Sequence, residues 1–303
     1  MNVIETRGLT KSYGGNLAVS NFDMHVQKGA IYGFIGRNGA GKSTVMKMIC
    51  ALVMPTSGEI ELFGSTTPEQ SSLSRIGVLI ESPGLFSHLN AYENMMTKAL
   101  SFGLVDPKEK ILSLLSLVGL EDAKDKKVKK YSMGMKQRLG LALALLGDPD
   151  LLLLDEPLNG LDPEGVQEMR NLILKLNEER GITVLISSHI LAHLGKMVSH
   201  YGIIRQGNMV REMSAAEVKL ECSDYLDLQA SDPARALILL QEAFPAAVFT
   251  VIQDGSLRIQ GEVDSSTIGE LLQKSGIAVH GLYTHHRDLE EYFVGLMGGE
   301  QHA

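Results

Sequence analysis

Residues 33–49 read GFIGRNGAGKSTVMKMI, and a glycine-rich turn in this stretch separates an apolar segment from an amphipathic one. The apolar residues before the turn predict a strand that is covered on both faces, and the residues after it predict a helix. Four residues have the spacing of a phosphate-binding loop: Gly36, Gly41, Lys42 and Ser43. Because such a loop needs a strand before it and a helix after it, the stretch predicts an α/β fold that binds a nucleotide.

The chemistry of this loop follows from its residue types. Glycines let successive backbone N–H groups curl around an anion, and the helix that follows directs its positive end towards the same anion. We expect Lys42 to contact the β- and γ-phosphates and the Ser43 hydroxyl to ligate Mg²⁺. The residues predicted to bind the nucleotide here are Gly36, Arg37, Asn38, Gly39, Ala40, Gly41, Lys42, Ser43 and Thr44.

A second apolar run, LLLLDEP at 151–157, ends in two adjacent carboxylates. Asp155 lies at the carboxyl end of the predicted strand, where we expect it to hold Mg²⁺ through water. Glu156 is expected to orient or deprotonate an attacking water. The pair predicts a hydrolytic site beside the phosphate-binding loop.

Composition narrows the class of protein. The chain has 303 residues with 44% hydrophobic and 21% charged content, as in an ordinary soluble protein with one large α/β domain or two domains. Its net charge of −8 argues against a nucleic-acid partner, because binding to phosphate backbones usually shows as a basic surplus. Cys50 and Cys222 lack the spacing of a disulfide framework or a metal site, which favours a reduced, intracellular protein. We predict no signal peptide and no transmembrane segment.

The order of predicted elements divides the chain near residue 215. Strands dominate the first third, and strands alternate with helices from residue 151 onwards, which implies a mainly parallel sheet covered by helices. Between these parts, Asp106 is expected to cap a helix whose first residue is Pro107. Residues 222–303 change to the order strand, helix, two strands, helix, strand and a last helix at 287–297. This βαββαβ order predicts a second, smaller α+β domain.

Residues 1–215 resemble the ATP-binding cassette (ABC) family, whose six motifs they carry in family order. Two motifs are the phosphate-binding loop and the acidic pair. The other four are Tyr13 in KSYGG, SMGM at 132–135, NGLD at 159–162 and His189 in LISSHIL. The resemblance implies a P-loop NTPase fold with a RecA-like core, an antiparallel β subdomain and a helical subdomain that carries the signature motif SMGM.

The resemblance also implies roles for these residues. Tyr13 would stack on adenine, and His189 would help Glu156 to orient the attacking water. The signature residues Ser132, Gly134 and Met135 would close over the γ-phosphate held by a second cassette, and the loop that includes Asp162 would cross the dimer interface. ATP would thus join two cassettes head to tail. A homodimer is expected, and a heterodimer with a degenerate partner stays open.

Two departures from the family pattern stand out. The stretch VLIESPGLF at 78–86 predicts a strand that ends on a carboxylate, Glu81, where the family usually has a glutamine that completes the Mg²⁺ and water shell. Glu81 could be a solvated residue, but the resemblance places it among the nucleotide and metal ligands. In the signature, Met133 replaces a glycine and Met135 replaces a glutamine. These departures and the small C-terminal domain resemble the cassette subunits of exporters for bacitracin and lantibiotics.

We therefore expect an ATP-binding and ATP-hydrolysing subunit of an exporter, with ATP and Mg²⁺ as cofactors. It would act through a separate transmembrane permease, from the cytoplasmic inner face of the membrane, on a peptide antibiotic or similar amphipathic cargo. The alternative is a soluble cassette ATPase that acts on ribosomes or DNA. Such proteins usually carry two cassettes or a coiled-coil insertion, and this sequence shows neither. A nucleotide sensor without turnover, and a C-terminal domain that braces the dimer or senses a ligand, also stay open.

Overall fold

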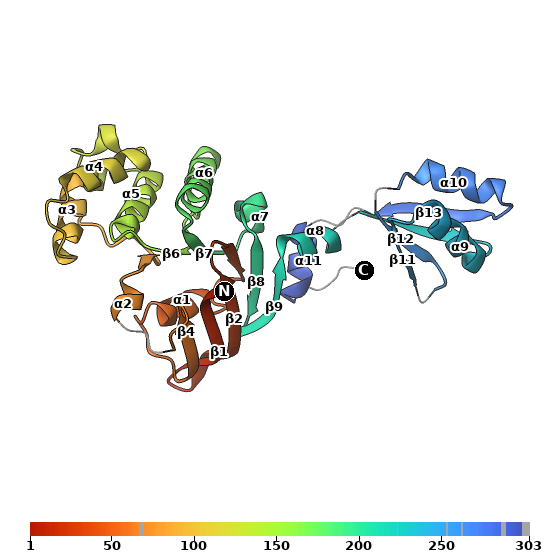
Figure 1. Cartoon of the computed structure of the whole chain (residues 1–303), viewed down its shortest axis with the longest axis horizontal. Coiled ribbons are helices and arrows are strands. Elements are labelled where there is room, and N and C mark those ends of the chain that lie inside the picture. Colours follow the sequence, from red (N-terminus) through yellow and green to blue (C-terminus); the bar gives the residue numbers. More distant parts are fainter. Residues whose placement is uncertain (67–69, 223, 253, 262, 286–288, 299–303) are drawn as a thin grey trace. The chain divides into compact units, whose positions relative to one another are not determined.

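The computed structural model describes residues 1–66, 70–222, 224–252, 254–261, 263–285 and 289–298. The chain divides into two compact units, Met1–Ala215 and Ala216–Ala303. Figure 1 shows the helices and strands of both units. Each unit has its own hydrophobic core.

A six-stranded sheet with the order β5-β6-β7-β3-β8-β9 forms the centre of the first unit. Its strands are β3 (Ile31–Ile35), β5 (Ile76–Leu79), β6 (Leu151–Asp155), β7 (Thr183–Ser188), β8 (His200–Arg205) and β9 (Asn208–Ser214). All neighbours are parallel except β8 and β9. Every residue of β3, β6 and β7 is buried, and β3 and β6 confirm the two strands predicted from apolar runs. Because these three strands are parallel, the loops that follow them meet at one edge of the sheet.

An antiparallel sheet with the order β2-β1-β4 packs on this core. Its strands are β1 (Asn2–Tyr13), β2 (Asn16–Gln27) and β4 (Ser57–Leu62). Phe22 of β2 meets Phe34 of β3 edge to face, with ring centroids 5.7 Å apart, and both belong to one cluster of buried side chains. Helix α1 (Lys42–Ile49) contacts both β2 and β6, so the helix after the phosphate-binding loop lies between the two sheets.

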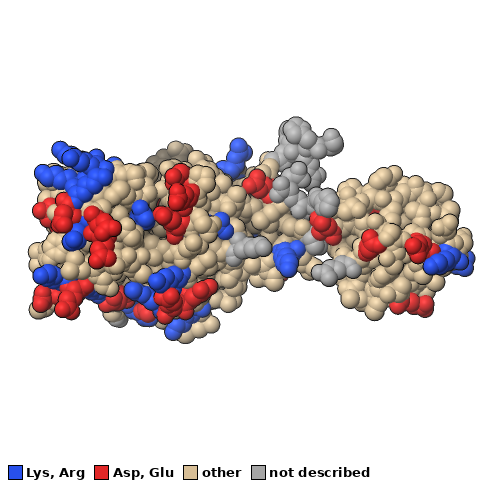
Figure 2. All heavy atoms as spheres, turned by 90° about the horizontal axis from the view of Figure 1, so that it is seen from above, with Lys and Arg blue, Asp and Glu red and all other residues tan. Residues whose placement is uncertain are grey.

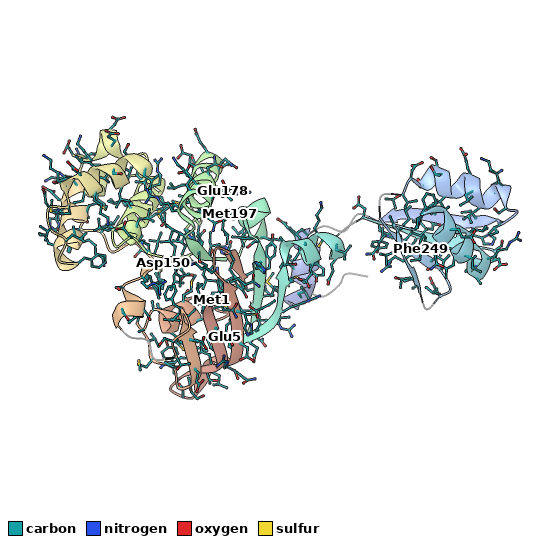
Figure 3. All side chains as sticks on the ribbon, in the orientation of Figure 1. Met1, Glu5, Asp150, Glu178, Met197 and Phe249 are labelled. Carbon is teal, nitrogen blue, oxygen red and sulfur yellow. The ribbon has the colours of Figure 1, made fainter. Side chains whose placement is uncertain are left out.

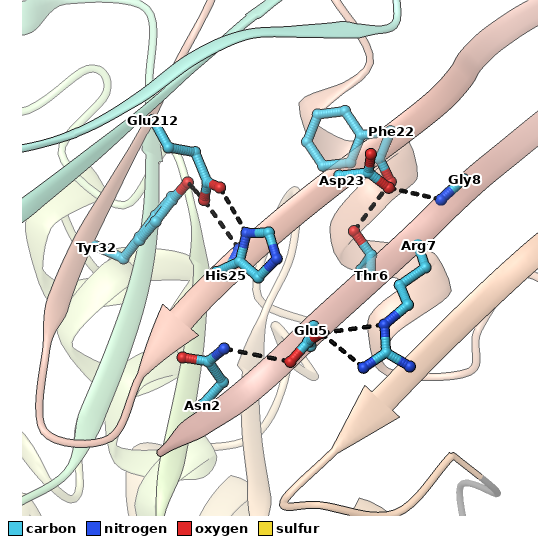
Figure 4. Close-up of polar contacts among 10 residues, drawn as sticks. All are labelled: Asn2, Glu5, Thr6, Arg7, Gly8, Phe22, Asp23, His25, Tyr32 and Glu212. Carbon is cyan, nitrogen blue, oxygen red and sulfur yellow. Dashed lines mark hydrogen bonds and ion pairs between the residues drawn. The ribbon is translucent and has the colours of Figure 1, made fainter.

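A polar network around the partly buried Glu212 ties the antiparallel sheet to the central sheet (Figure 4). The Tyr32 hydroxyl on β3 donates a 2.5 Å hydrogen bond to Glu212 Oε1 on β9. The backbone N–H of His25 on β2 donates to the same oxygen over 2.9 Å, and His25 Nδ1 lies 2.8 Å from Glu212 Oε2. One carboxylate therefore joins three strands.

Helices form the other part of the first unit. They are α2 (Gln70–Leu73), α3 (Ala91–Ser101), α4 (Lys108–Leu117), α5 (Met133–Leu145), α6 (Pro163–Arg180) and α7 (Leu191–Leu194), with short 3₁₀ turns at Glu121–Ala123, Val128–Lys130 and Gly195–Met197. Helices α3, α4 and α5 contact one another (Figure 1), and α5 also packs on β5. The predicted cap at Asp106 is wrong. Pro107 is the N-cap of α4, and Asp106 has a left-handed φ of +45°, which a short polar side chain tolerates.

The second unit contains an antiparallel sheet with the order β11-β12-β10-β13. Its elements are α8 (Ala215–Glu221), β10 (Tyr225–Ala230), α9 (Pro233–Ala243), β11 (Val248–Val251), β12 (Leu257–Gln260), α10 (Ser265–Lys274), β13 (Val279–His285) and α11 (Leu289–Leu296). From β10 to β13 this is the βαββαβ order that the sequence predicts. Leu228 and Ile259 lie in its core, with Phe249, labelled in Figure 3, packed against them. Residues 287 and 288 of the predicted last helix lie outside the described residues.

Over the described residues, none of the helices combines the length and the apolar character that crossing a membrane requires. On the face seen in Figure 2, basic and acidic side chains lie side by side over the first unit.

Candidate functional site

The phosphate-binding loop runs from the end of β3 to the start of α1. Backbone atoms crowd it: a Cβ on Gly36 would lie 2.6 Å from the carbonyl oxygen of Ile204, and one on Gly41 would lie 2.7 Å from that of Ala18. Gly41 also has a φ of +111°, which disfavours any residue with a side chain. Gly41 is the N-cap of α1, so the first-turn N–H groups of the helix border the loop. The loop is therefore a tight cradle with an electropositive floor.

Lys42 fills this cradle. Its side chain is nearly buried, and its ammonium donates hydrogen bonds to the carbonyl oxygens of Gly36 (2.6 Å) and Arg37 (3.4 Å). The same Nζ lies 3.3 Å from Glu156 Oε1. A cation is thus held beside the loop amides, where bound phosphates would need one. Arg37, Asn38 and Gly39 are exposed at the tip of the loop.

The two predicted carboxylates lie at the end of β6, with Asp155 as its last residue and Glu156 directly after it, and both are fixed by a residue of β7. Asp155 is only 4% exposed, and its Oδ1 accepts a 2.6 Å hydrogen bond from the hydroxyl of Ser187. The same hydroxyl oxygen accepts a hydrogen bond from the backbone N–H of Glu156 at 2.9 Å. Ser187 is a site residue that the sequence interpretation missed. The feature that could have identified it is the parallel pairing of β6 with β7, which places Ser187 opposite Asp155. Ser187 lies two residues before His189.

Glu156 stands between a lysine and a histidine. Its Oε2 lies 2.9 Å from His189 Nδ1, and its Oε1 makes the ion-pair contact with Lys42. Within the described part of the chain, this buried Oε1 accepts no hydrogen bond, because the Lys42 contact lacks hydrogen-bond geometry. Glu156 also has a φ of +51°, a left-handed conformation that is strained for glutamate. A strained, partly buried carboxylate whose buried Oε1 accepts no hydrogen bond among the described residues suits a group that binds a reacting water.

Glu81 lies at the rim of the site. Strand β5 ends at Leu79, before the strand end predicted at Glu81, and Glu81 lies in the loop that follows with a φ of +61°. Its carboxylate pairs with the ammonium of Lys47 on α1, and its side chain is 64% exposed. The hydrogen bond to Glu81 raises the pKa of Lys47, with smaller contributions from the nearby Tyr13 and Asp155. Glu81 is therefore close to the acidic pair but bound to a lysine.

The signature residues form a separate recess. Ser132 is the N-cap of α5, and its hydroxyl accepts a 3.3 Å hydrogen bond from the backbone N–H of Met135. A cavity of about 460 Å³ adjoins this helix start. Its walls include Ser132, Met133, Gly134, Gly160, Leu161 and Asp162. Asp162 also caps α6 by accepting a hydrogen bond from the N–H of Gly165. Two motifs about 30 residues apart thus share one cavity.

Tyr13 is exposed at the end of β1, with Lys11 Nζ 5.0 Å from the centre of its ring. An exposed ring offers a surface on which a base could stack.

The donor set suits magnesium. Ser43, Asp155 and Glu81 offer oxygen atoms, which Mg²⁺ prefers. Among the described residues, no three acidic, histidine or cysteine side chains are close enough to hold a metal by themselves. Such a site fits Mg²⁺ that arrives with phosphates and keeps several waters.

A glycine-rich cradle at a helix N-terminus, a buried lysine and an acidic pair at the end of a buried strand define a P-loop nucleotide hydrolase. Comparison with known proteins gives the family. The ABC transporter family model matches residues 19–159. The chain is 43% identical over 300 residues to the bacitracin transport ATP-binding protein BcrA of Bacillus licheniformis, covering 98% of both chains. It is 43% identical over 210 residues to the lantibiotic transport ATP-binding protein SrtF of Streptococcus pyogenes, covering 69% of this chain and 90% of SrtF. The chain belongs to the family of ABC transporter ATP-binding proteins.

Solved structures agree. The dimeric, post-hydrolysis cassette MJ0796 bound to ADP and phosphate superposes with a TM-score of 0.63 and 26% identity, covering 70% of this chain and 98% of that one. A nucleotide-free cassette from an ABC transporter gives a TM-score of 0.66 at 23% identity, covering 72% and 94%. The predicted fold class and the ATP-hydrolysing transporter subunit are confirmed.

Proposed function

We propose that this ATPase drives export of a peptide antibiotic or a similar amphipathic compound through a separate transmembrane subunit. The observation that carries the proposal is the similarity to a bacitracin transport protein along 98% of both chains, which includes the second unit. The same similarity disfavours a soluble cassette that acts on ribosomes or DNA. The chain would work at the cytoplasmic face of the membrane.

The site geometry supports in-line hydrolysis of ATP. Glu156 Oε1 accepts a proton from water as the water oxygen bonds to the γ-phosphorus, and the bond from the γ-phosphorus to the ADP oxygen breaks. His189 holds the other carboxylate oxygen, which keeps Oε1 aimed at the water. Lys42 and the loop N–H groups stabilise the charge that develops on the phosphoryl oxygens. When bound, Mg²⁺ neutralises phosphate charge, and Ser43, Asp155 and Glu81 would hold it directly or through water.

The cavity at the start of α5 supports a head-to-tail homodimer. Ser132 and Gly134 stand at a helix N-terminus, which attracts anions. In the proposed dimer they face the γ-phosphate held by the other copy, with Met135 and Asp162 beside them. Each copy would complete the site of its partner.

A larger cavity, of about 870 Å³, supports docking of the transmembrane subunit. It lies beside β5 and is lined by residues of the loop after β5, of α3 and of α5, including Glu81, Pro83, Phe102 and Gly140. We propose that a cytoplasmic helix of the permease occupies it. Glu81 would then link the nucleotide to the permease.

The test is recovery of tagged Glu156→Gln protein from native membranes with Mg-ATP. This variant should bind ATP without turnover, so the complex is held in one state. A multi-spanning membrane protein in stoichiometric yield supports the proposal and gives the permease. Recovery of ribosomal or DNA-repair proteins instead would contradict it.

A further inference from the structure

Lys47 and Glu81 form an ion pair at the rim of the nucleotide site. Lys47 lies on α1 one turn after Ser43, and its ammonium donates a hydrogen bond to Glu81 Oε1. Residues four apart share a face of a helix, so Lys47 is on the same face as the proposed magnesium ligand Ser43. The partner of Glu81 is therefore a cation next to the place where a metal would bind.

We infer that Lys47 is a positioning residue: it holds Glu81 at the rim in the absence of nucleotide, and Glu81 leaves Lys47 for the magnesium and water shell when Mg-ATP binds. The inference rests on the proposed role of Glu81 in that shell.

Two features make this exchange physically reasonable. The side chain of Glu81 is 64% exposed and that of Lys47 is 29% exposed, and ion pairs in contact with solvent are weak, so a divalent cation can displace the lysine. The backbone of Glu81 lies outside β5, so its side chain can turn without disturbing the sheet.

The exchange also changes the cavity proposed for the permease. Lys47 and Glu81 both line it, and the pair is neutral while the two side chains are in contact. Once Glu81 turns to the metal, the ammonium of Lys47 is left in the wall of the cavity. The charge offered to the permease would then depend on the nucleotide.

The test is a magnesium titration of the full chain with a fluorescent, non-hydrolysable ATP analogue, which measures binding rather than turnover. Lys47→Met removes the competitor for Glu81, so the half-saturating Mg²⁺ concentration should fall by about two- to five-fold. In the Glu81→Gln background the same substitution should not lower it, because the amide forms no ion pair. Lys47→Arg keeps the pair and should keep the native value.

Amine labelling followed by mass spectrometry reads the contact directly. Lys47 should react faster when Mg²⁺ and the analogue are both present than with the analogue and a chelator. In Glu81→Gln this difference should disappear. Lys175, an exposed lysine of α6, is the internal control and should react equally in all states.

The outcomes separate two failures. If Glu81→Gln changes the magnesium dependence but Lys47→Met acts equally in both backgrounds, Lys47 does not position Glu81 and the inference is wrong. If neither substitution changes the dependence, Glu81 is outside the metal shell and that part of the proposed function fails as well. ATP binding and permease recovery would be unaffected by the first failure.

Discussion

Ser187 is the residue on which the geometry of the acidic pair depends. Its hydroxyl donates to Asp155 and accepts from the backbone N–H of Glu156, so one side chain fixes both members of the pair. Residues that orient metal or water ligands in this way usually affect activity almost as much as the ligands themselves.

Ser187→Ala should therefore lower the ATPase rate by on the order of tenfold while nucleotide binding changes little. The N–H of Glu156 would lose its acceptor, at a cost of about 1–3 kcal/mol of stability. Steady-state hydrolysis and binding of a non-hydrolysable analogue measure the two effects. Ser188→Ala is the matched control, since among the described residues the Ser188 hydroxyl bonds only to the backbone of Ile190, donating to its carbonyl oxygen and accepting from its N–H. An undiminished rate in Ser187→Ala would contradict this role.

At the same scale, the sequence predicted which residues meet but not every contact between them. Lys42, Asp155 and His189 each lie at or after the end of an apolar run that forms a strand. Because parallel strands have their carboxyl ends at the same edge of a sheet, this position is enough to predict that the three side chains lie close together. The partner of Glu81 was not predictable, since Lys47 is 34 positions away and only the tertiary fold brings α1 beside the loop that follows β5. Ser187 was missed because nothing in its local sequence distinguishes it from Ser188.

At the scale of elements, the start of α5 combines two roles for Ser132. Its hydroxyl caps the helix, and we propose that the same helix end receives the phosphate of a partner cassette. The local sequence cannot separate these roles, because serine is favoured both at helix N-caps and near bound anions.

Substitutions at Ser132 can separate them. Ser132→Ala should cost about 1 kcal/mol of stability through the lost cap. Ser132→Asp should keep the cap but place a negative charge where the phosphate would come, so stability is retained and ATP-dependent dimerisation is lost. Thermal unfolding and light scattering with Mg-ATP, both in the Glu156→Gln background, measure the two properties. Dimerisation of Ser132→Asp at the native ATP concentration would contradict the anion role.

The carboxylate of Glu212, which joins three strands, predicts a dependence of stability on pH. Burial, reinforced by the charge of Glu212, raises the pKa of Tyr32 well above the ordinary tyrosine value. The unfolded chain therefore loses this proton first as the pH rises. The stabilisation is complete below the ordinary tyrosine pKa of about 10 and is lost as the pH rises from there towards the folded value.

Tyr32→Phe should remove this dependence. Between pH 10 and 11 the native chain should lose up to about 1.4 kcal/mol more unfolding free energy than the variant. At neutral pH the variant should be less stable by about 1–3 kcal/mol, because Glu212 loses a buried donor. Urea unfolding of the first unit at several pH values measures both effects. Tyr13→Phe, which alters an exposed ring, should keep the native slope, and equal slopes in Tyr32→Phe and the native chain would refute the argument.

At the scale of the whole molecule, the two units have separate cores. The core of the first unit joins both of its sheets and α1, and the core of the second is built from β10, β12, α9 and α10. All the residues proposed for the nucleotide site belong to the first unit. The sequence predicts a boundary near residue 215, because the pattern of strands and helices changes there. It does not indicate what chemistry the residues after that boundary perform.

Separate cores predict separate unfolding. Leu228→Ala, at a fully buried position of β10, should destabilise the second unit by about 2–5 kcal/mol and leave nucleotide binding unchanged. Leu153→Ala in β6 is the matched control, since it removes the same volume from the buried core of the first unit beside Asp155. It should destabilise the first unit and weaken nucleotide binding, and leave the unfolding of the second unit unchanged. A chain that ends at residue 215 should retain only the transition that Leu153→Ala shifts, and should still bind Mg-ATP. Urea unfolding of all three variants, followed with a fluorescent nucleotide, tests this. If Leu228→Ala lowers the urea concentration of nucleotide release as much as Leu153→Ala does, the two units unfold together. The second unit then contributes directly to the stability of the ATPase.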